Sequence, residues 1–347
     1  MQILQAFKRT LKDPLGLVSF VYIVFLVCMA VFADLVVPDK SPYANQMHLS
    51  IHSKPPGFET MLLQRVDENG NLMEEIPVQA TKWESNQLFY LEEGLGATYF
   101  KPLVLTGFPE GTTYEIVEKE YLKKTSFIWG TDKFGRDLFS RMVFGTRISL
   151  SIGFVAVFIS LLLGVFLGGI GGFLGGRTDQ VVLWLINVVW SIPSLLMVIA
   201  ITLALGKGFW QVFIAVGLTM WVEVARLTRG LVISIKEQTH VDAARVLGFS
   251  PLRIFTHHIF PLLIPSLIVL STANFASAIL IESGLSFLGI GAQPPIPSWG
   301  GMIKDHYRYI ILGKPYLAII PGIAIMSVVL AFMLIGNSLR DALDVKG

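Results

Sequence analysis

Few residues of this 347-residue chain have the types and spacing that catalysis requires. The segment 171–178 has the glycine spacing of a phosphate-binding loop, but Arg177 replaces its lysine and an apolar run stands where a strand should precede it. His257 and His258 are adjacent, so on a helix they diverge by about 100° and do not share a metal ion. Cys28 is the only cysteine, which excludes an internal disulfide and a cysteine-based metal site. We therefore expect no active site, resident metal or cofactor in this chain.

The composition is that of a membrane protein. The chain is 53% hydrophobic and 15% charged, against roughly 25% charged residues in average chains, and its mean hydropathy is +0.63. Six apolar runs are long enough to cross a bilayer, at about 14–37, 147–177, 180–206, 208–225, 259–281 and 315–336. We expect an all-α polytopic protein with six transmembrane helices.

The first apolar run follows Lys8, Arg9 and Lys12, which is the pattern of a signal peptide as well as of a first membrane helix. The run is long for the core of a signal peptide, so we expect an uncleaved helix with a cytoplasmic N-terminus. Cleavage after the small residue Ala33 is the alternative. Basic residues on the other proposed inner segments support this orientation, with a cytoplasmic C-terminus, although the outer side also carries several.

Residues 38–126 differ from the rest of the chain, because thirteen acidic residues there face only eight basic ones. Asn69-Gly70 between two mixed runs predicts a hairpin, and a second hairpin is expected from 103–105 to 113–117. We expect a small β-rich insert outside the membrane. It either contacts a substrate carrier or only covers the surface. The predicted domains are 1–37, with the N-terminus and first helix, the insert 38–126, and a core 127–347.

A polar segment separates two apolar runs of the core, at about 227–258. Within it Gly248 is expected to end one short helix and Ser250-Pro251 to start another. Ala243 and Ala244 are small enough for a partner surface to approach closely. The segment is either a docking loop or an ordinary helix-turn-helix between membrane spans.

Three blocks of the sequence carry a family resemblance. The spacing Asp242-Ala243-Ala244, Gly248 and Pro261 resembles the EAA signature of ABC importer permeases, with Asp in place of the usual Glu. Residues 129–150 closely resemble the GTDxxGRDxxSRxxxGxRxSL block of the C-type permease subunit of peptide importers. Residues 282–300 look like the ESxLSFLGxG…PPxPSWG pattern of the same subunits. The resemblance covers 129 to the C-terminus and the first span, but not the insert.

The resemblance implies the type I ABC importer permease fold and the import of di- or oligopeptides across the bacterial cytoplasmic membrane. The implied partners are membrane lipid, a second, B-type permease subunit, two ATPase subunits that bind ATP and Mg, and an extracytoplasmic peptide-binding protein; nucleic acid is not among them. The segment that resembles EAA is then the coupling helix that docks on an ATPase. The expected coupling residues are Asp242, Ala243, Ala244, Arg245, Gly248, Pro251, Arg253 and Pro261.

Two asparagines inside the apolar runs, an acid at the end of the fifth run and a tryptophan in the Pro- and Gly-rich loop after it are candidates for the translocation pathway. These are Asn187, Asn274, Glu282 and Trp299. Joining helices is the alternative role for the asparagines, and the family commonly has Asp where Asn187 stands. Glu282 alternatively pairs with Lys304 or reaches the membrane surface. Glu223 is expected to be structural and to pair with Arg226.

Two further structural features follow from the core sequence. Pro193 is expected to kink the third span. Gly164, Gly168, Gly172 and Gly176 repeat every fourth residue, which permits close helix crossing in the second.

Other functions are compatible with parts of the sequence. The same importer architecture also serves nickel or metal chelates. A secondary transporter working without ATP predicts inverted repeats with matching broken helices, and we find no such internal symmetry. A pure scaffold does not explain the docking loop.

Overall fold

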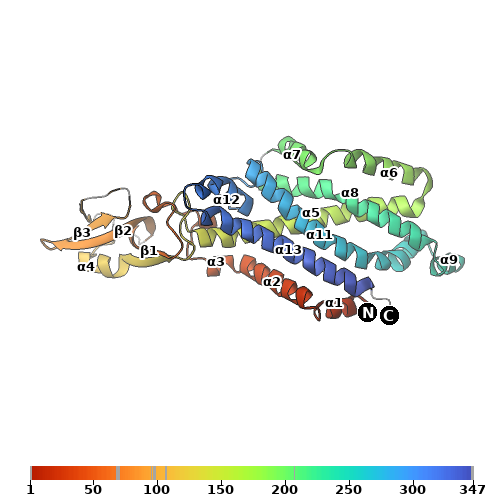
Figure 1. The fold of residues 1–347 in the computed structure, drawn as a ribbon, viewed down its shortest axis with the longest axis horizontal. Helices are drawn as coiled ribbons and strands as arrows, with labels where there is room; N and C mark the ends of the chain where they lie inside the picture. Colours follow the sequence, from red (N-terminus) through yellow and green to blue (C-terminus); the bar gives the residue numbers. More distant parts are fainter. Residues whose placement is uncertain are drawn as a thin grey trace. The chain divides into compact units, whose positions relative to one another are not determined.

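The computed structural model describes residues 2–67, 71–94, 96, 99–105, 108–206 and 208–344. The chain forms two compact units. A helical unit contains Met1–Phe32, Gly145–Lys304 and Pro321–Gly347, and a sheet unit contains Ala33–Phe144 and Asp305–Ile320. Figure 1 shows the helices and the strands of the two units by their labels.

Long apolar helices dominate the described chain. Five are long and apolar enough to cross a membrane. They are α2 (Pro14–Val31), α5 (Leu138–Leu174), α8 (Phe209–Lys236), the run Pro251–Leu288 that contains α10 (Pro251–Ile254) and α11 (Phe260–Leu288), and α13 (Tyr316–Asp344). Shorter helices are α1 (Gln2–Thr10), α3 (Ala33–Val36), α9 (Thr239–Val246) and α12 (Trp299–His306). The expected polytopic helical fold is confirmed.

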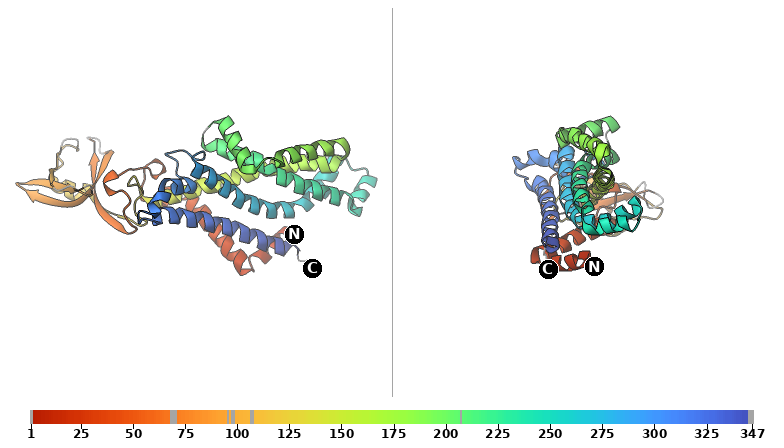
Figure 2. Two further views of the ribbon diagram at one scale, coloured as in Figure 1. Left: turned by 45° about the horizontal axis from the view of Figure 1, so that its top comes forward. Right: turned by 90° about the vertical axis from the view of Figure 1, so that its right-hand side faces the viewer.

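The third predicted span is broken into two helices. α6 (Gly176–Trp190) and α7 (Ser194–Leu205) meet at an angle of 91°, and the pair counts as a sixth span only if taken together. The break lies at Pro193, which has no N–H for a helical hydrogen bond and disfavours helical backbone at Ile192. The predicted kink is therefore confirmed, and it is sharp enough to turn the chain. Both α6 and α7 pack beside α8 (Figure 2).

Three of the four ladder glycines lie on α5 and face α8, and the fourth begins α6. A Cβ on Gly168 would lie 2.3 Å from the carbonyl oxygen of Ala225, and one on Gly172 2.8 Å from that of Arg229. Gly164 packs in the same way against Val224, whereas Gly176 has open space around it. The ladder therefore brings the backbones of α5 and α8 into contact.

α8 is longer than the sequence predicts. The apolar run ends near Ala225, but the helix continues to Lys236 because the charged residues that follow are good helix formers. The predicted end of this span was wrong by three turns. Glu223 consequently lies at the midpoint of α8, on the order of 20 Å from either end at 1.5 Å per residue.

The two ends of the chain lie side by side in the helical unit (Figures 1 and 2). Asp13, which caps α2, accepts a hydrogen bond from the hydroxyl of Ser338 on α13. The hydroxyls of Tyr22 and Ser327 join the same two helices at 2.7 Å. At the other end of α2, Arg147 Nε donates to the carbonyl oxygen of Ala30 at 2.8 Å. The first span is thus held by both α13 and α5.

The sheet unit contains a five-stranded antiparallel sheet of order β4-β3-β2-β1-β5. The strands are β1 (Phe58–Val66), β2 (Leu72–Glu84), β3 (Gln87–Glu92), β4 (Lys101–Pro102) and β5 (Leu122–Phe127). Short 3-10 turns, η1 (Pro42–Ala44) and η2 (Leu49–Ile51), precede it. Leu63, Val78, Leu88 and Val117 are buried at the centre of its core.

The two hairpins expected in the insert had different outcomes. β1 and β2 pair antiparallel around the first, with Leu63 opposite Ile76, while Asn69-Gly70 lies outside the described residues. The second prediction was wrong. The Thr113 hydroxyl accepts from the N–H of Ile116 and caps α4 (Tyr114–Ile116), and a π turn, η3 (Val117–Tyr121), follows it. The next strand, β5, then pairs with the distant β1.

Candidate functional site

The segment expected to couple to an ATPase forms two short helices joined by a tight turn, α9 and α10. α9 is seated on the helical unit by Val241 and Ala244, which are buried among Val232, Ile235 and Ile259. The side chain of Ala243 instead faces outward. Only one of the two alanines is therefore placed for contact with a partner, and the other fixes α9 to α8 and α11.

The turn between α9 and α10 is built as the sequence predicts. Gly248 has φ +74°, a left-handed conformation that favours glycine, and its N–H donates to the Arg245 carbonyl at 2.9 Å. Ser250 caps α10 by accepting from the Arg253 N–H at 3.4 Å, and Pro251 occupies the first turn. The predicted helix stop and start are both confirmed.

The outward face of this segment is apolar, which the sequence analysis missed. Val246, Leu247 and Leu252 are 87%, 71% and 74% exposed, and we call these three residues the apolar tip. The tip lies at the same end of the helical unit as the two termini (Figure 1). Exposed leucines on a short polar helix typically mark a protein contact. The sequence signal that could have revealed them is their helical position, since they lie on the faces opposite the buried Val241 and Ala244.

The remaining predicted coupling residues lie on α9, on α10 and in the first turn of α11. Asp242 and Arg245 form an exposed ion pair at 2.9 Å. The Arg253 guanidinium lies 4.3 Å from the ring centre of Phe249, and Pro251 is exposed beside it. Pro261 lies in the first turn of α11, beyond a π turn, η4 (Phe255–Ile259). The charged side chains therefore rim an apolar centre, as in protein interfaces.

The four predicted pathway residues do not gather at one cavity. Glu282 is fully buried in α11, where Ser286 donates to one of its oxygens at 2.6 Å. Trp299 is buried at the start of α12, against Gly145. Asn274 is buried in α11, and only Asn187, on α6, is exposed.

The loop between α11 and α12 is held against α11 by its polar residues. The N–H of Ala292 donates to Ser286 Oγ at 3.2 Å, and Gln293 Nε2 donates to the carbonyl oxygen of Gly291 at 2.8 Å. A Cβ on Gly300 would lie 2.3 Å from the Ser283 carbonyl oxygen, so the backbones touch. Irregular backbone is satisfied here by protein groups. Glu282 and Ser286 therefore anchor this loop.

A cavity of about 520 Å³ lies where α6 and α7 break. Val189, Trp190, Ile192, Pro193, Ser194 and Met197 line it from the break, Thr219, Met220, Val222 and Glu223 from α8, and Ser277, Leu280 and Ile281 from α11. Glu223 does not form the expected pair with Arg226 among the described residues. The Arg226 guanidinium instead lies 3.9 Å from the ring centre of Trp190. The carboxylate of Glu223 is left exposed in the cavity.

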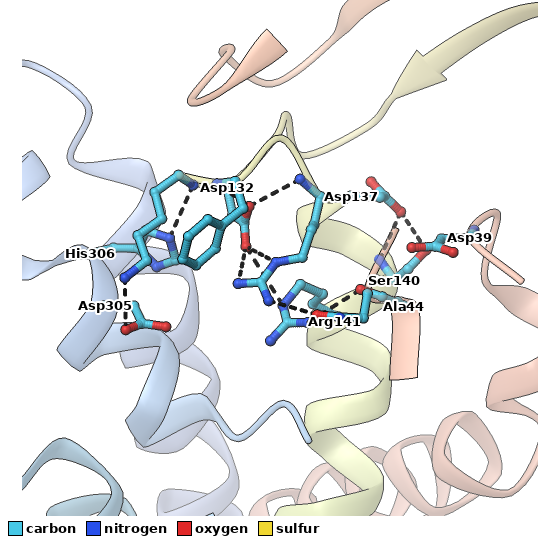
Figure 3. A network of polar contacts seen from close by, with 12 residues as sticks. Asp39, Ala44, Asp132, Asp137, Ser140, Arg141, Asp305 and His306 are labelled. Carbon is cyan, nitrogen blue, oxygen red and sulfur yellow. Dashed lines mark hydrogen bonds and ion pairs between the residues drawn. The ribbon is translucent and has the colours of Figure 1, made fainter. Parts of the chain in front are cut away.

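The block 129–141 forms a buried charge cluster in the sheet unit (Figure 3). The Asp132 carboxylate is fully buried and contacts Arg136 at 2.6 Å and Arg141 at 3.7 Å. It also accepts from the N–H groups of Phe134, at 2.8 Å, and Arg136, at 3.0 Å. Residues 129–137 form a turn that is closed by an antiparallel bridge between Thr131 and Asp137.

Neighbouring segments extend this charge cluster. Arg136 also donates to the Asn45 side-chain oxygen at 2.9 Å, and Lys133 pairs with Asp305 at 3.0 Å. Burial raises the pKa of Asp137, although Ser140 donates a hydrogen bond to its carboxylate. The carboxylates of this cluster pair with cations or accept from backbone donors, as Asp137 does from the N–H of Ser140 at 2.9 Å, so the cluster is built to hold the start of α5.

Two protein families match the chain. The family described as the inner membrane component of binding-protein-dependent transport systems matches residues 140–346. The N-terminal transmembrane domain of oligopeptide transport permease C matches residues 2–56.

Curated relatives are about two fifths identical to this chain over the residues that align. The dipeptide transport system permease protein DppC of Alkalihalophilus pseudofirmus is 42% identical over 63% of this chain and 71% of the relative. The oligopeptide permease OppC of Bacillus subtilis is 40% identical over the same shares. The glutathione permease GsiD of Pectobacterium atrosepticum is 38% identical over 62% and 72%. Among solved structures, a chain of the MetNI methionine ABC transporter aligns with a TM-score of 0.49 and 18% identity over 58% of this chain and 95% of its own.

The first family match covers more than half of the chain and includes every long helix except α2, which the second covers. Permeases of this family are not enzymes, since separate ATPase subunits hydrolyse ATP, and a partner permease and a substrate-binding protein complete the system. The apolar spans agree with a multi-pass membrane location. The chain belongs to the family of inner membrane components of binding-protein-dependent transport systems.

Proposed function

We propose that the chain is the C-type transmembrane subunit of an ATP-driven importer of di- or oligopeptides. The observation that carries the coupling part of this proposal is the apolar tip, because an exposed apolar centre with a charged rim fits the groove of a partner protein. The peptide cargo is supported by the relatives, whose names specify dipeptides, oligopeptides and the tripeptide glutathione.

Partner ATPase subunits bind ATP and Mg, and their movement reaches the membrane through α9. Val241 and Ala244 pack against residues of both α8 and α11, so a displacement of α9 moves two spans together. Asp242, Ala243, Arg245 and Gly248 supply the outward surface around the apolar tip. A cavity between the two permease subunits then opens first to the outside and next to the cytoplasm, and this alternating access carries the peptide inward.

The proposed orientation places both termini and α9 in the cytoplasm. These elements share one end of the helical unit, and basic residues cluster there, as the positive-inside rule requires. They are Lys8, Arg9, Lys236, Arg245 and Arg340. The domain division 1–37, 38–126 and 127–347 then puts the acidic insert outside, where it meets the peptide-binding protein or only covers the surface.

The proposal is tested by purifying the tagged chain in mild detergent after expression with its natural operon partners. We expect two ATPase subunits and a second permease to co-elute, and ATP to drive uptake of labelled peptide into vesicles. Gly248→Asp meets no steric clash and strains only the left-handed turn, so we expect it to insert normally but to abolish uptake.

Three results would count against the proposal. Normal uptake by Gly248→Asp removes the coupling role of this turn. Uptake of a nickel chelate in place of peptide changes the cargo. Elution of the chain without ATPases, together with ATP-independent uptake, makes it a secondary transporter.

A further inference from the structure

The cavity at the α6–α7 break contains an ionisable group of α8, two residues before the end of the apolar run of this helix. Glu223 lies halfway along α8, and its side chain is exposed among apolar residues of three helices. Ionisable residues within membrane helices are costly, face the bundle interior or a water-filled cavity, and generally mark a substrate or ion pathway. Within the described chain, the carboxylate has neither a hydrogen bond nor an ion pair.

The polar groups beside Glu223 favour a cation that donates hydrogen bonds. Thr219 lies one turn before Glu223 on the same face of α8, and its hydroxyl donates to the Val216 carbonyl at 2.8 Å. The hydroxyl proton is therefore used, and the oxygen presents only lone pairs to the cavity. Two acceptors one turn apart suit an ammonium group, which has three N–H donors and no acceptor.

The backbone at the break does not cancel the charge of Glu223. The C-terminal end of α6 and the N-terminal end of α7 both line the cavity, and their partial charges of about half a unit have opposite sign. Arg226 does not line the cavity, because its guanidinium is stacked on the Trp190 ring. Within the lining, Glu223 is the only full charge of the described residues.

We propose that this cavity binds the α-ammonium group of the peptide substrate, with Glu223 as its counter-ion and Thr219 as a second acceptor. The inference rests on the proposed function and names the chemistry by which the permease itself recognises a peptide. A volume of about 520 Å³ lies within the range of small-molecule sites, roughly 300–1,000 Å³. The apolar lining then surrounds the first side chains of the peptide without selecting among them.

The test removes the Glu223 carboxylate and the peptide amine, each alone and both together, and compares the effects on binding. Binding of radiolabelled trialanine and of propionyl-dialanine, which lacks only the amine, is measured by equilibrium dialysis on the purified complex with its partner permease and ATPases. We expect amine removal to weaken binding at least tenfold in the natural complex and to have no effect in Glu223→Gln. Glu237→Gln, which removes an exposed carboxylate at the end of the same helix, should behave as the natural complex does.

A structural role for Glu223 predicts a different result. If Glu223 only balances Arg226, then Arg226→Gln combined with Glu223→Gln restores trialanine binding, which overturns the inference. Equal loss on amine removal in the natural and Glu223→Gln complexes also overturns it, as does absence of binding by the natural complex. Glu223→Asp, which keeps the charge, should retain part of the discrimination and exclude misfolding as the cause.

The proposed function fails separately. If ATP drives no trialanine uptake into vesicles supplied with the binding protein, the importer assignment is wrong whatever Glu223 binds. Suppose that uptake is normal in Glu223→Gln and that amine removal weakens binding equally in the natural and Glu223→Gln complexes. The importer assignment then stands and only the ammonium site is rejected.

Discussion

Arg229 on α8 donates two parallel hydrogen bonds to Asp179 on α6, from Nε to one carboxylate oxygen at 2.5 Å and from Nη2 to the other at 2.7 Å. Both side chains are largely shielded, at 22% and 18% exposed. A two-point contact of this kind fixes angle as well as distance. It therefore holds the start of the broken span against the helix that carries Glu223.

Loss of this pair should loosen α6. Arg229→Lys cannot reproduce the planar two-point contact, and we expect the free energy of unfolding to fall by about 2 kcal/mol. Thermal unfolding of the purified protein in detergent measures the change. Asp242→Asn, which removes an exposed ion pair, is the control and should cost at most about 0.5 kcal/mol. Equal melting temperatures for both variants would contradict the prediction.

The buried charge cluster should be far more sensitive than surface pairs. Arg136→Met leaves the Asp132 carboxylate without its nearest cation, and removing one member of a buried pair costs about 3–5 kcal/mol. Lys82→Met, in an exposed pair with Glu84, is the matched control. We expect Arg136→Met to be degraded or to show rapid amide exchange at the start of α5. Stability like that of Lys82→Met is the result that rejects this.

Two glycines in long helices should respond to alanine in opposite directions. Gly168→Ala places a methyl group 2.3 Å from the Ala225 carbonyl oxygen, so α5 and α8 must separate. At Gly230 the same change meets open space and gains helix propensity, about 1 kcal/mol. Melting temperatures in detergent should fall for Gly168→Ala and rise or stay constant for Gly230→Ala. A fall of equal size in both would show that helix contact is not the cause.

The sheet unit should lose stability as the pH falls. Burial lowers the pKa of His48, although nearby Glu75 opposes the shift. The unfolded chain binds a proton near pH 6.5, whereas folded His48 stays neutral to lower pH, so stability decreases as the pH falls below about 6.5. Amide exchange of β1, corrected for its intrinsic pH dependence, should accelerate between pH 7 and 5. His48→Gln should remove this component, and an unchanged pH profile in that variant would refute the assignment.

The apolar tip should be needed for ATPase binding and not for folding. Leu247→Asp places a charge at the centre of the tip, and we expect the ATPases to be lost on purification while the partner permease remains. Ile311→Asp changes a residue that is 91% exposed in the sheet unit and should retain them. Retention of the ATPases by Leu247→Asp would place the docking surface elsewhere.

Much of the helical unit followed from the sequence, because long uncharged runs admit few alternatives to a membrane span. The Gly248 turn was predictable for a similar reason, since left-handed backbone favours glycine. Helix length was less predictable. Arg226 ends the apolar run without ending α8, which continues to Lys236, and Thr113 began a helical turn where alternation favoured a strand.

The candidate sites were harder to predict because they combine distant segments. Glu223 was expected to be structural. Its cavity could not be predicted from the sequence, because it forms only where the bend at Pro193 brings α6 and α7 beside α8. Leu247 was overlooked because exposure depends on which residues of α9 face the bundle. Glu282 and Trp299 were expected to line a pathway, but their polar and small neighbours bury them. Their roles remain predictions.

The bonds that join the first and last spans also set an order of assembly. During synthesis, the carbonyl of Ala30 can accept its hydrogen bond from Arg147 as soon as α5 has entered the membrane. Asp13 and Tyr22 must wait for Ser338 and Ser327, more than three hundred residues later. The N-terminal end of α2 therefore lacks these two hydrogen bonds until α13 has been synthesised and has packed beside it.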